Sequence, residues 1–189
     1  MKILLQTPLP RYANEFWEVL KLFRPVEAFA VEATAPLTPE DAAKAQFTAS
    51  APTADMEVLR HEFTQHGGLW RCSFTLRGET AQREAPAAHA DALHRKRLQK
   101  RLCKLTLYDL CKRLTGEQPP WGSLTGIRPT RLLYEKLAGG MTLAEGAEAL
   151  AAEFDVTPEK AELLARIVTA QQALPAPAAN DADVYISIP

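Results

Sequence analysis

An alternating stretch, residues 69–77, constrains the fold most strongly. Apolar side chains occupy every second position, and polar side chains lie between them: Trp70, Cys72, Phe74 and Leu76 against Arg71, Ser73, Thr75 and Arg77. Because successive side chains of a strand point to opposite faces, this pattern predicts a β-strand with one buried face. A second apolar stretch, residues 56–63, precedes it across His66-Gly67-Gly68, which is typical of a hairpin turn. We therefore expect a small antiparallel sheet with helices on one side.

The rest of the first 85 residues predicts further strands and helices. Lys2 to Gln6 and Val26 to Glu32 are short apolar segments typical of strands. Between them, apolar residues recur on one face of a helix: Tyr12, Phe16, Val19, Leu20 and Phe23. A short helix is predicted from Thr38, as N-cap, to Phe47. Residues 1–85 are thus predicted to form a small α+β region.

A long helix is predicted over residues 86–115, and it opens a helical region, residues 86–172. Its first half is basic: Arg95, Lys96, Arg97, Lys100, Arg101 and Lys104. Its second half is apolar nearly all round, which predicts that this half is buried. We interpret the basic half as a solvated face, because no aromatic residues interleave with the charges as base stacking requires. Contact with an anion or nucleic acid is the alternative.

Three shorter helices, a linker and a strand complete the chain. The helices are predicted over residues 129–138, 142–154 and 157–170, and Thr142 with Glu145 forms a capping box. Residues 173–182, ALPAPAANDA, are predicted to be a linker. Residues 183–189 predict an apolar strand with no obvious partner. We therefore expect the chain to be the N-terminal part of a longer protein.

Composition argues against two classes of protein. The chain is 47% hydrophobic and 24% charged, with a net charge of −1, so nothing favours nucleic acid or a membrane surface overall. The first residues, MKILLQTP, have three consecutive apolar residues, too few for a signal-peptide core, and no apolar run is long enough to span a bilayer. We expect a cytoplasmic protein.

The cysteines and histidines predict no metal site. Cys103 and Cys111 are eight residues apart on a predicted helix, about 12 Å along its axis, which is too far for a disulfide or a shared ion. These two and Cys72 are interpreted as small core residues. No local spacing gathers the histidines into a ligand set: His61, His66, His89 and His94.

The segment 119–131, PPWGSLTGIRPTR, is the candidate functional site. Gly122 and Gly126 permit positive φ angles, and Pro129 suits the first turn of a helix. Arg128 then lies at a helix entrance, where free N–H groups and the helix dipole favour anions. The alternative is a buried connector in which Arg128 pairs with a local carboxylate and three apolar residues fill a core: Trp121, Leu124 and Ile127.

Two stretches resemble one enzyme family. WGSLTGIRP, residues 121–129, is similar to a motif ahead of the catalytic barrel in HemZ-type oxygen-independent coproporphyrinogen III dehydrogenases. These belong to the radical S-adenosylmethionine (radical SAM) class. DVYISIP, residues 183–189, looks like the first strand of that barrel. In the family, this strand leads into Phe-Cys-x3-Cys-x2-Cys, whose thiolates hold a [4Fe–4S] cluster. The resemblance covers residues 119–138 and 183–189.

The resemblance implies an activity for the full-length parent protein. In this class the reduced cluster cleaves S-adenosylmethionine, and the resulting radical starts the loss of two propionates of coproporphyrinogen III as carbon dioxide. The product is protoporphyrinogen IX, for haem synthesis. The resemblance further implies that this chain alone holds neither cluster nor S-adenosylmethionine and is inactive. Its partners would be its own C-terminal barrel and, through the full-length protein, a tetrapyrrole.

The resemblance also suggests site residues. Tyr185 matches by position the tyrosine at the S-adenosylmethionine site, although the histidine that many relatives have two residues later is Ser187 here. Arg128 and Arg131 suit the carboxylates of cofactor or substrate, or a contact with the barrel. The other candidate contacts are small residues of the same segment: Gly122, Ser123, Thr125 and Gly126.

Other functions remain open at this stage. The parent is alternatively a haem-handling relative without dehydrogenase activity, or the chain is an interaction module. The helices 142–154 and 157–170 also have the lengths of a helix-turn-helix. However, seven acidic and two basic residues lie between Glu135 and Glu162, a balance that repels phosphate, so we expect no nucleic-acid partner.

Overall fold

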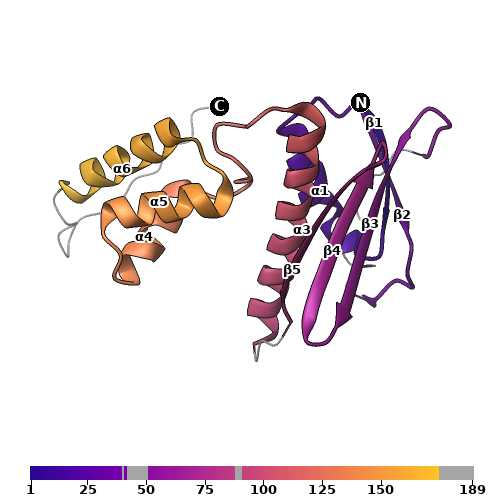
Figure 1. Ribbon diagram of the computed structural model, residues 1–189, viewed down its shortest axis with the longest axis horizontal. Helices are drawn as coiled ribbons and strands as arrows, with labels where there is room; N and C mark the ends of the chain where they lie inside the picture. Colours follow the sequence, from indigo (N-terminus) through magenta and orange to yellow (C-terminus); the bar gives the residue numbers. More distant parts are fainter. Residues whose placement is uncertain (40, 42–50, 88–90, 175–189) are drawn as a thin grey trace, which may run out of the picture.

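The computed structural model describes residues 1–39, 41, 51–87 and 91–174 and confirms the α+β class (Figure 1). Within the described residues, one unit is a five-stranded sheet with the helices that pack on it, and the other is a bundle of three helices. The strands are β1 Lys2–Thr7, β2 Ala28–Ala33, β3 Glu57–His66, β4 Leu69–Leu76 and β5 Glu79–Pro86. The helices are η1 Pro10–Tyr12, α1 Ala13–Lys21, α3 Ala92–Thr115, α4 Pro129–Ala138, α5 Leu143–Phe154 and α6 Pro158–Gln172.

The sheet is mixed, not wholly antiparallel as expected. Its order is β2-β1-β3-β4-β5. The hairpin partners β3, β4 and β5 are antiparallel, whereas β1 is parallel to both β2 and β3. The parallel pairing of β1 with β2 arises because α1 carries the chain back between them, as parallel strands require. Local patterns of alternation do not encode the direction of a partner that is distant in sequence.

Strand β5 was missed by the sequence analysis. Its sequence, ETAQREAP, has few apolar residues, and Ala81 is its one fully buried residue. An edge strand needs little apolar surface, so the alternating signal is absent. The following helix consequently begins later than predicted. Asp91 is its N-cap, and its carboxylate accepts hydrogen bonds from the N–H groups of Leu93 and His94, at 3.1 and 2.9 Å.

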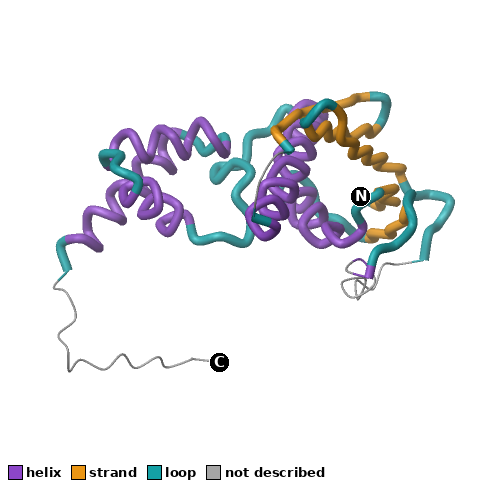
Figure 2. Tube along the Cα trace, turned by 90° about the horizontal axis from the view of Figure 1, so that it is seen from below, coloured by secondary structure: helices purple, strands orange, loops and turns teal. Residues whose placement is uncertain are grey.

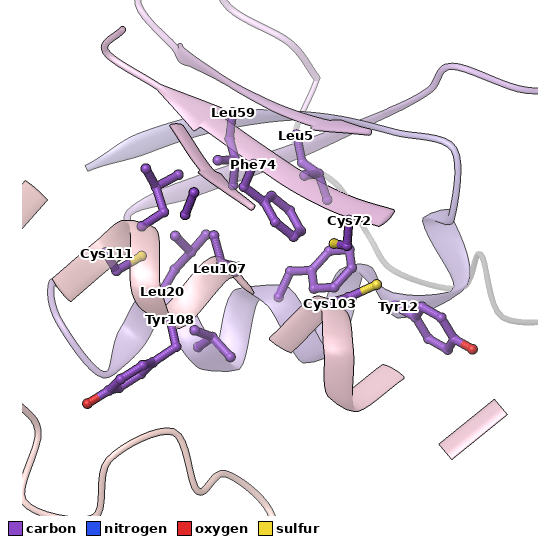
Figure 3. Close-up of a cluster of buried hydrophobic side chains, with 14 of the residues drawn as sticks. Leu5, Tyr12, Leu20, Leu59, Cys72, Phe74, Cys103, Leu107, Tyr108 and Cys111 are labelled. Atoms are coloured by element: carbon purple, nitrogen blue, oxygen red, sulfur yellow. The ribbon is translucent and has the colours of Figure 1, made fainter. Parts of the chain in front are cut away.

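The main core lies between one face of the sheet and helices α1 and α3. Figure 2 shows both helices on the same side of the strands. The four alternating residues of β4 are all buried, as predicted, and so is the apolar face of α1. The second half of α3 packs into this core, as expected from its apolar sequence (Figure 3). Thus α3 packs with the sheet rather than with the three later helices.

The second unit packs α4, α5 and α6 around a small core of four buried residues: Leu133, Leu150, Leu164 and Val168. The predicted capping box of α5 is confirmed, because the Thr142 hydroxyl accepts from the Glu145 N–H and the Glu145 carboxylate accepts from the Thr142 N–H at 2.8 Å. No helix in the described part of the chain is long and apolar enough to cross a membrane.

Some predictions fall outside the described residues. These are the strand 183–189 with Tyr185, nearly all of the linker 173–182, and most of the short helix expected after Thr38. They remain predictions.

Candidate functional site

The loop between α3 and α4 lies where the two units meet (Figure 1). Its backbone is hydrogen-bonded to the turn between α5 and α6. The Ser123 N–H donates to the Phe154 carbonyl at 2.8 Å, and the buried Ser123 hydroxyl donates to the same oxygen at 3.2 Å. In return, the Thr157 N–H donates to the Pro120 carbonyl at 3.1 Å. These bonds fix the middle of the loop to the three-helix bundle.

Gly122 and Gly126, the two glycines of the candidate segment 119–131, are required for different reasons. Both have positive φ, +56° at Gly122 and +67° at Gly126. A Cβ at Gly122 would lie 1.9 Å from the Phe154 carbonyl oxygen, whereas a Cβ at Gly126 would meet nothing within 4 Å. Gly122 therefore permits the close approach of loop and bundle, and Gly126 permits only a change of chain direction.

Charged groups of α3 also connect the units. Asp155, at the C-cap of α5, accepts hydrogen bonds from the Tyr108 hydroxyl at 2.7 Å and from Lys112 Nζ at 2.6 Å. Burial raises the pKa of Tyr108, and the Asp155 carboxylate raises it further. Arg101 pairs with Glu153, next to this turn. These polar contacts join the middle and the C-terminal part of α3 to the end of α5, whereas the apolar contacts of α3 are with the sheet unit.

The basic half of α3 is only partly the solvated face expected from the sequence. Besides Arg101, Lys104 contributes to the junction, because its Nζ donates to the Thr125 carbonyl of the loop at 3.3 Å. Lys100 instead pairs with Glu15 of α1 at 3.1 Å. Several of these charges therefore stabilise contacts within the chain.

The alternative interpretation, in which three apolar residues of the loop fill a core, is confirmed at one residue and wrong at another. Leu124 is buried, and Trp121 is half-buried, with Lys160 Nζ 5.5 Å from its ring centroid. Ile127, in contrast, is 48% exposed and belongs to neither apolar core of the described residues. The chain turns at Gly126, after the bonds from Ser123 to the bundle turn, and this leaves Ile127 outside both cores.

The two candidate arginines differ in their surroundings. Arg128 is the N-cap residue of α4; its side chain is exposed and makes no hydrogen bond or ion pair with any residue that the structure describes. The local carboxylate partner proposed as an alternative is thus not found in that part of the chain. Arg131 pairs with Glu135 at 3.1 Å, but both side chains are exposed, so the pair contributes little stability. Ile127 and Arg128 together form an exposed apolar and cationic pair at the N-terminus of α4.

The structure also brings together three potential metal ligands that the sequence analysis missed. His61, Cys72 and Cys103 lie in the main core, on β3, β4 and α3. Hydrogen bonds with Cys103 and His61 together lower the pKa of Cys72 to about 6 despite burial, and the bond with Cys103 is the largest cause. The sequence held one signal of this site, the two-residue turn at Gly67-Gly68. The turn fixes the register of β3 and β4, and this register places His61 and Cys72 as diagonal neighbours on one face of the sheet. No sequence pattern places α3 above them.

Comparison with known proteins gives one partial similarity. No family model matches the chain, and no solved structure matches it. The chain is 37% identical over 78 residues to a curated protein of Bacillus subtilis (strain 168), "oxygen-independent coproporphyrinogen-III oxidase-like protein HemZ". The match covers 40% of this chain and 16% of that protein, so the chain corresponds to a small part of its relative. The chain is therefore related to HemZ over a limited part of its length.

Proposed function

We propose that this chain is the N-terminal accessory region of a HemZ-like radical SAM protein that converts coproporphyrinogen III to protoporphyrinogen IX. The partial similarity to HemZ supports this assignment, and so does the resemblance of residues 121–129 and 183–189 to motifs of that family. The parent protein would hold a [4Fe–4S] cluster and S-adenosylmethionine in its C-terminal barrel. Bound there, these groups supply the radical chemistry.

The cluster does not fit the cysteines of this chain. A [4Fe–4S] cluster of this class needs three thiolates close together. Cys72 and Cys103 lie together, but Cys111 is two turns further along α3 (Figure 3). The contribution of this chain is therefore one of binding and positioning.

One observation supports a specific role for the loop. Arg128 presents an exposed guanidinium without a partner in the described residues, beside exposed Ile127 and at the N-terminus of α4. Arginine binds carboxylates through two parallel hydrogen bonds, and a helix N-terminus also favours negative charge. We expect Arg128 to bind a carboxylate of the barrel or of its bound ligands, with Ile127 covering the adjacent apolar surface.

The test uses the full-length parent protein under anaerobic conditions. Arg128→Ala should lower kcat/KM for coproporphyrinogen III about 10- to 100-fold, the loss of one hydrogen bond to a charged group, while circular dichroism stays unchanged. Arg60→Ala is the matched control, because Arg60 is an exposed arginine on β3 of the sheet unit and lies outside the loop.

Equal activities of the two variants would contradict the role of Arg128. A wild-type protein that binds haem but forms no protoporphyrinogen IX would instead favour the haem-handling alternative. Separation of the products by chromatography distinguishes these outcomes.

A further inference from the structure

A compact group of metal-binding side chains lies inside the sheet unit. His61 is 2% exposed, and Cys72 and Cys103 are both 0% exposed. One ligand atom from each residue lies within 4.8 Å of the other two. Figure 3 shows Cys72 and Cys103 meeting between the sheet and α3, with Cys111 well apart on the same helix. Three separate elements thus supply one nitrogen and two sulfur atoms.

The spacing of these atoms suits a zinc ion. His61 Nε2 and Cys72 Sγ are 3.5 Å apart. Zinc binds cysteine sulfur at about 2.3 Å and histidine nitrogen at about 2.0–2.1 Å, so two such ligands at a tetrahedral angle lie about 3.6 Å apart. The observed separation agrees with this value, and His61 and Cys72 require little movement to share an ion.

The histidine ring is held in the orientation that a ligand needs. The Thr7 hydroxyl is hydrogen-bonded to His61 Nδ1 at 2.7 Å, which leaves Nε2 facing Cys72. Phe74 stacks on the ring at 4.2 Å with an interplanar angle of 4°, and Phe16 contacts it edge-on at 5.3 Å. Metal-binding histidines are typically fixed by a hydrogen bond at their other ring nitrogen.

The charge balance favours a divalent transition-metal ion such as zinc. Two thiolates and a neutral imidazole cancel the charge of Zn²⁺, so the complex avoids the cost of a buried net charge. Monovalent copper would leave one negative charge in the core, and calcium or magnesium requires oxygen ligands. We propose that His61, Cys72 and Cys103 bind one Zn²⁺ ion. Three protein ligands leave one coordination position for a small exogenous donor. The ion ties β3 and β4 to α3.

Cobalt substitution tests the site directly. The chain is stripped with a chelator under reducing conditions and titrated with Co²⁺. One equivalent should produce a thiolate-to-cobalt charge-transfer band in the near ultraviolet, which Zn²⁺ then abolishes by displacing cobalt. Cys103→Ala should lose the band. Cys111→Ala is the matched control, because Cys111 is also a buried thiol of α3, and this variant should keep the band.

A variant outside the ligand set guards against loss of folding. Thr7→Val removes the hydroxyl that is hydrogen-bonded to His61 Nδ1 and that accepts from the Leu9 N–H, and it leaves all three ligand atoms in place. It should weaken zinc binding 10- to 100-fold, as for other outer-shell partners, while circular dichroism confirms that the variant is folded. The proposal is overturned if folded wild-type chain gives no charge-transfer band, or if Thr7→Val binds as tightly as wild type. It is also overturned if Cys111→Ala loses the band as Cys103→Ala does, or if mass spectrometry finds that a disulfide between Cys72 and Cys103 persists under the reducing conditions of the titration.

Discussion

Replacing Gly122 by alanine tests whether the loop is fixed to the three-helix bundle by close backbone contact. The new Cβ would lie 1.9 Å from the Phe154 carbonyl oxygen, and ordinary contact begins at about 3.4 Å. Since the obstructing atoms belong to the backbone, no side chain can rotate to relieve the clash. The loop must then move away from the bundle turn and break both hydrogen bonds from Ser123 to Phe154.

The magnitude follows from these contacts. An alanine at positive φ costs about 1–2 kcal/mol, and each lost hydrogen bond costs about 1 kcal/mol. Gly122→Ala should therefore destabilise the chain by about 3–4 kcal/mol. Gly126→Ala is the matched control, because Gly126 has a similar φ of +67° and open space at the Cβ position. It should cost only the conformational part, about 1–2 kcal/mol.

Urea unfolding followed by circular dichroism measures the free energy of unfolding of both variants. Hydrogen exchange at the Ser123 amide reports the contact itself, and its protection should fall in Gly122→Ala but persist in Gly126→Ala. Equal losses of stability in the two variants, or a Ser123 amide that stays protected in Gly122→Ala, would refute the reasoning.

Three further predictions concern acid stability, packing and metal content. Burial raises the pKa of Asp41, but hydrogen bonds from Thr38 and the ion pair with Arg11 outweigh it and leave the pKa below 3.8. The stabilising effect of the Asp41 carboxylate is therefore present above about pH 3.8 and is lost as the pH falls through its folded pKa. Wild type should lose more free energy of unfolding between about pH 5 and about pH 2 than Asp41→Asn does, as measured by urea unfolding. Trp121→Ala should lower the free energy of unfolding by about 1–2 kcal/mol because the ring is half-buried, whereas Phe74→Ala should lower it by about 3–5 kcal/mol because Phe74 is fully buried. Equal losses in the two variants would contradict this. Anaerobic reconstitution should load no iron–sulfur cluster, because only two of the three cysteines lie together; stoichiometric, chelator-resistant iron and sulfide would show otherwise.

The sequence by itself determined the elements that depend on local periodicity. The alternation in β4, the apolar face of α1 and the capping box of α5 were all predicted and found, because each depends on residues close together in the chain. The loop between α3 and α4 was likewise recognised from its glycines and from Pro129 at the start of α4. These features follow from backbone geometry, which neighbouring residues largely fix.

The tertiary structure decided what depends on partners distant in sequence. The parallel pairing of β1, the polar edge strand β5 and the exposure of Ile127 each depend on what packs beside them, which periodicity does not record. The same holds for the group of His61, Cys72 and Cys103. The hairpin register places the first two on one face, but only the packing of α3 on the sheet brings Cys103 to them. Metal-binding chemistry requires atoms a few ångströms apart in space. His61 and Cys72 are close in sequence across the hairpin, but Cys103 comes from a helix distant in sequence, so no local spacing could have revealed the complete site.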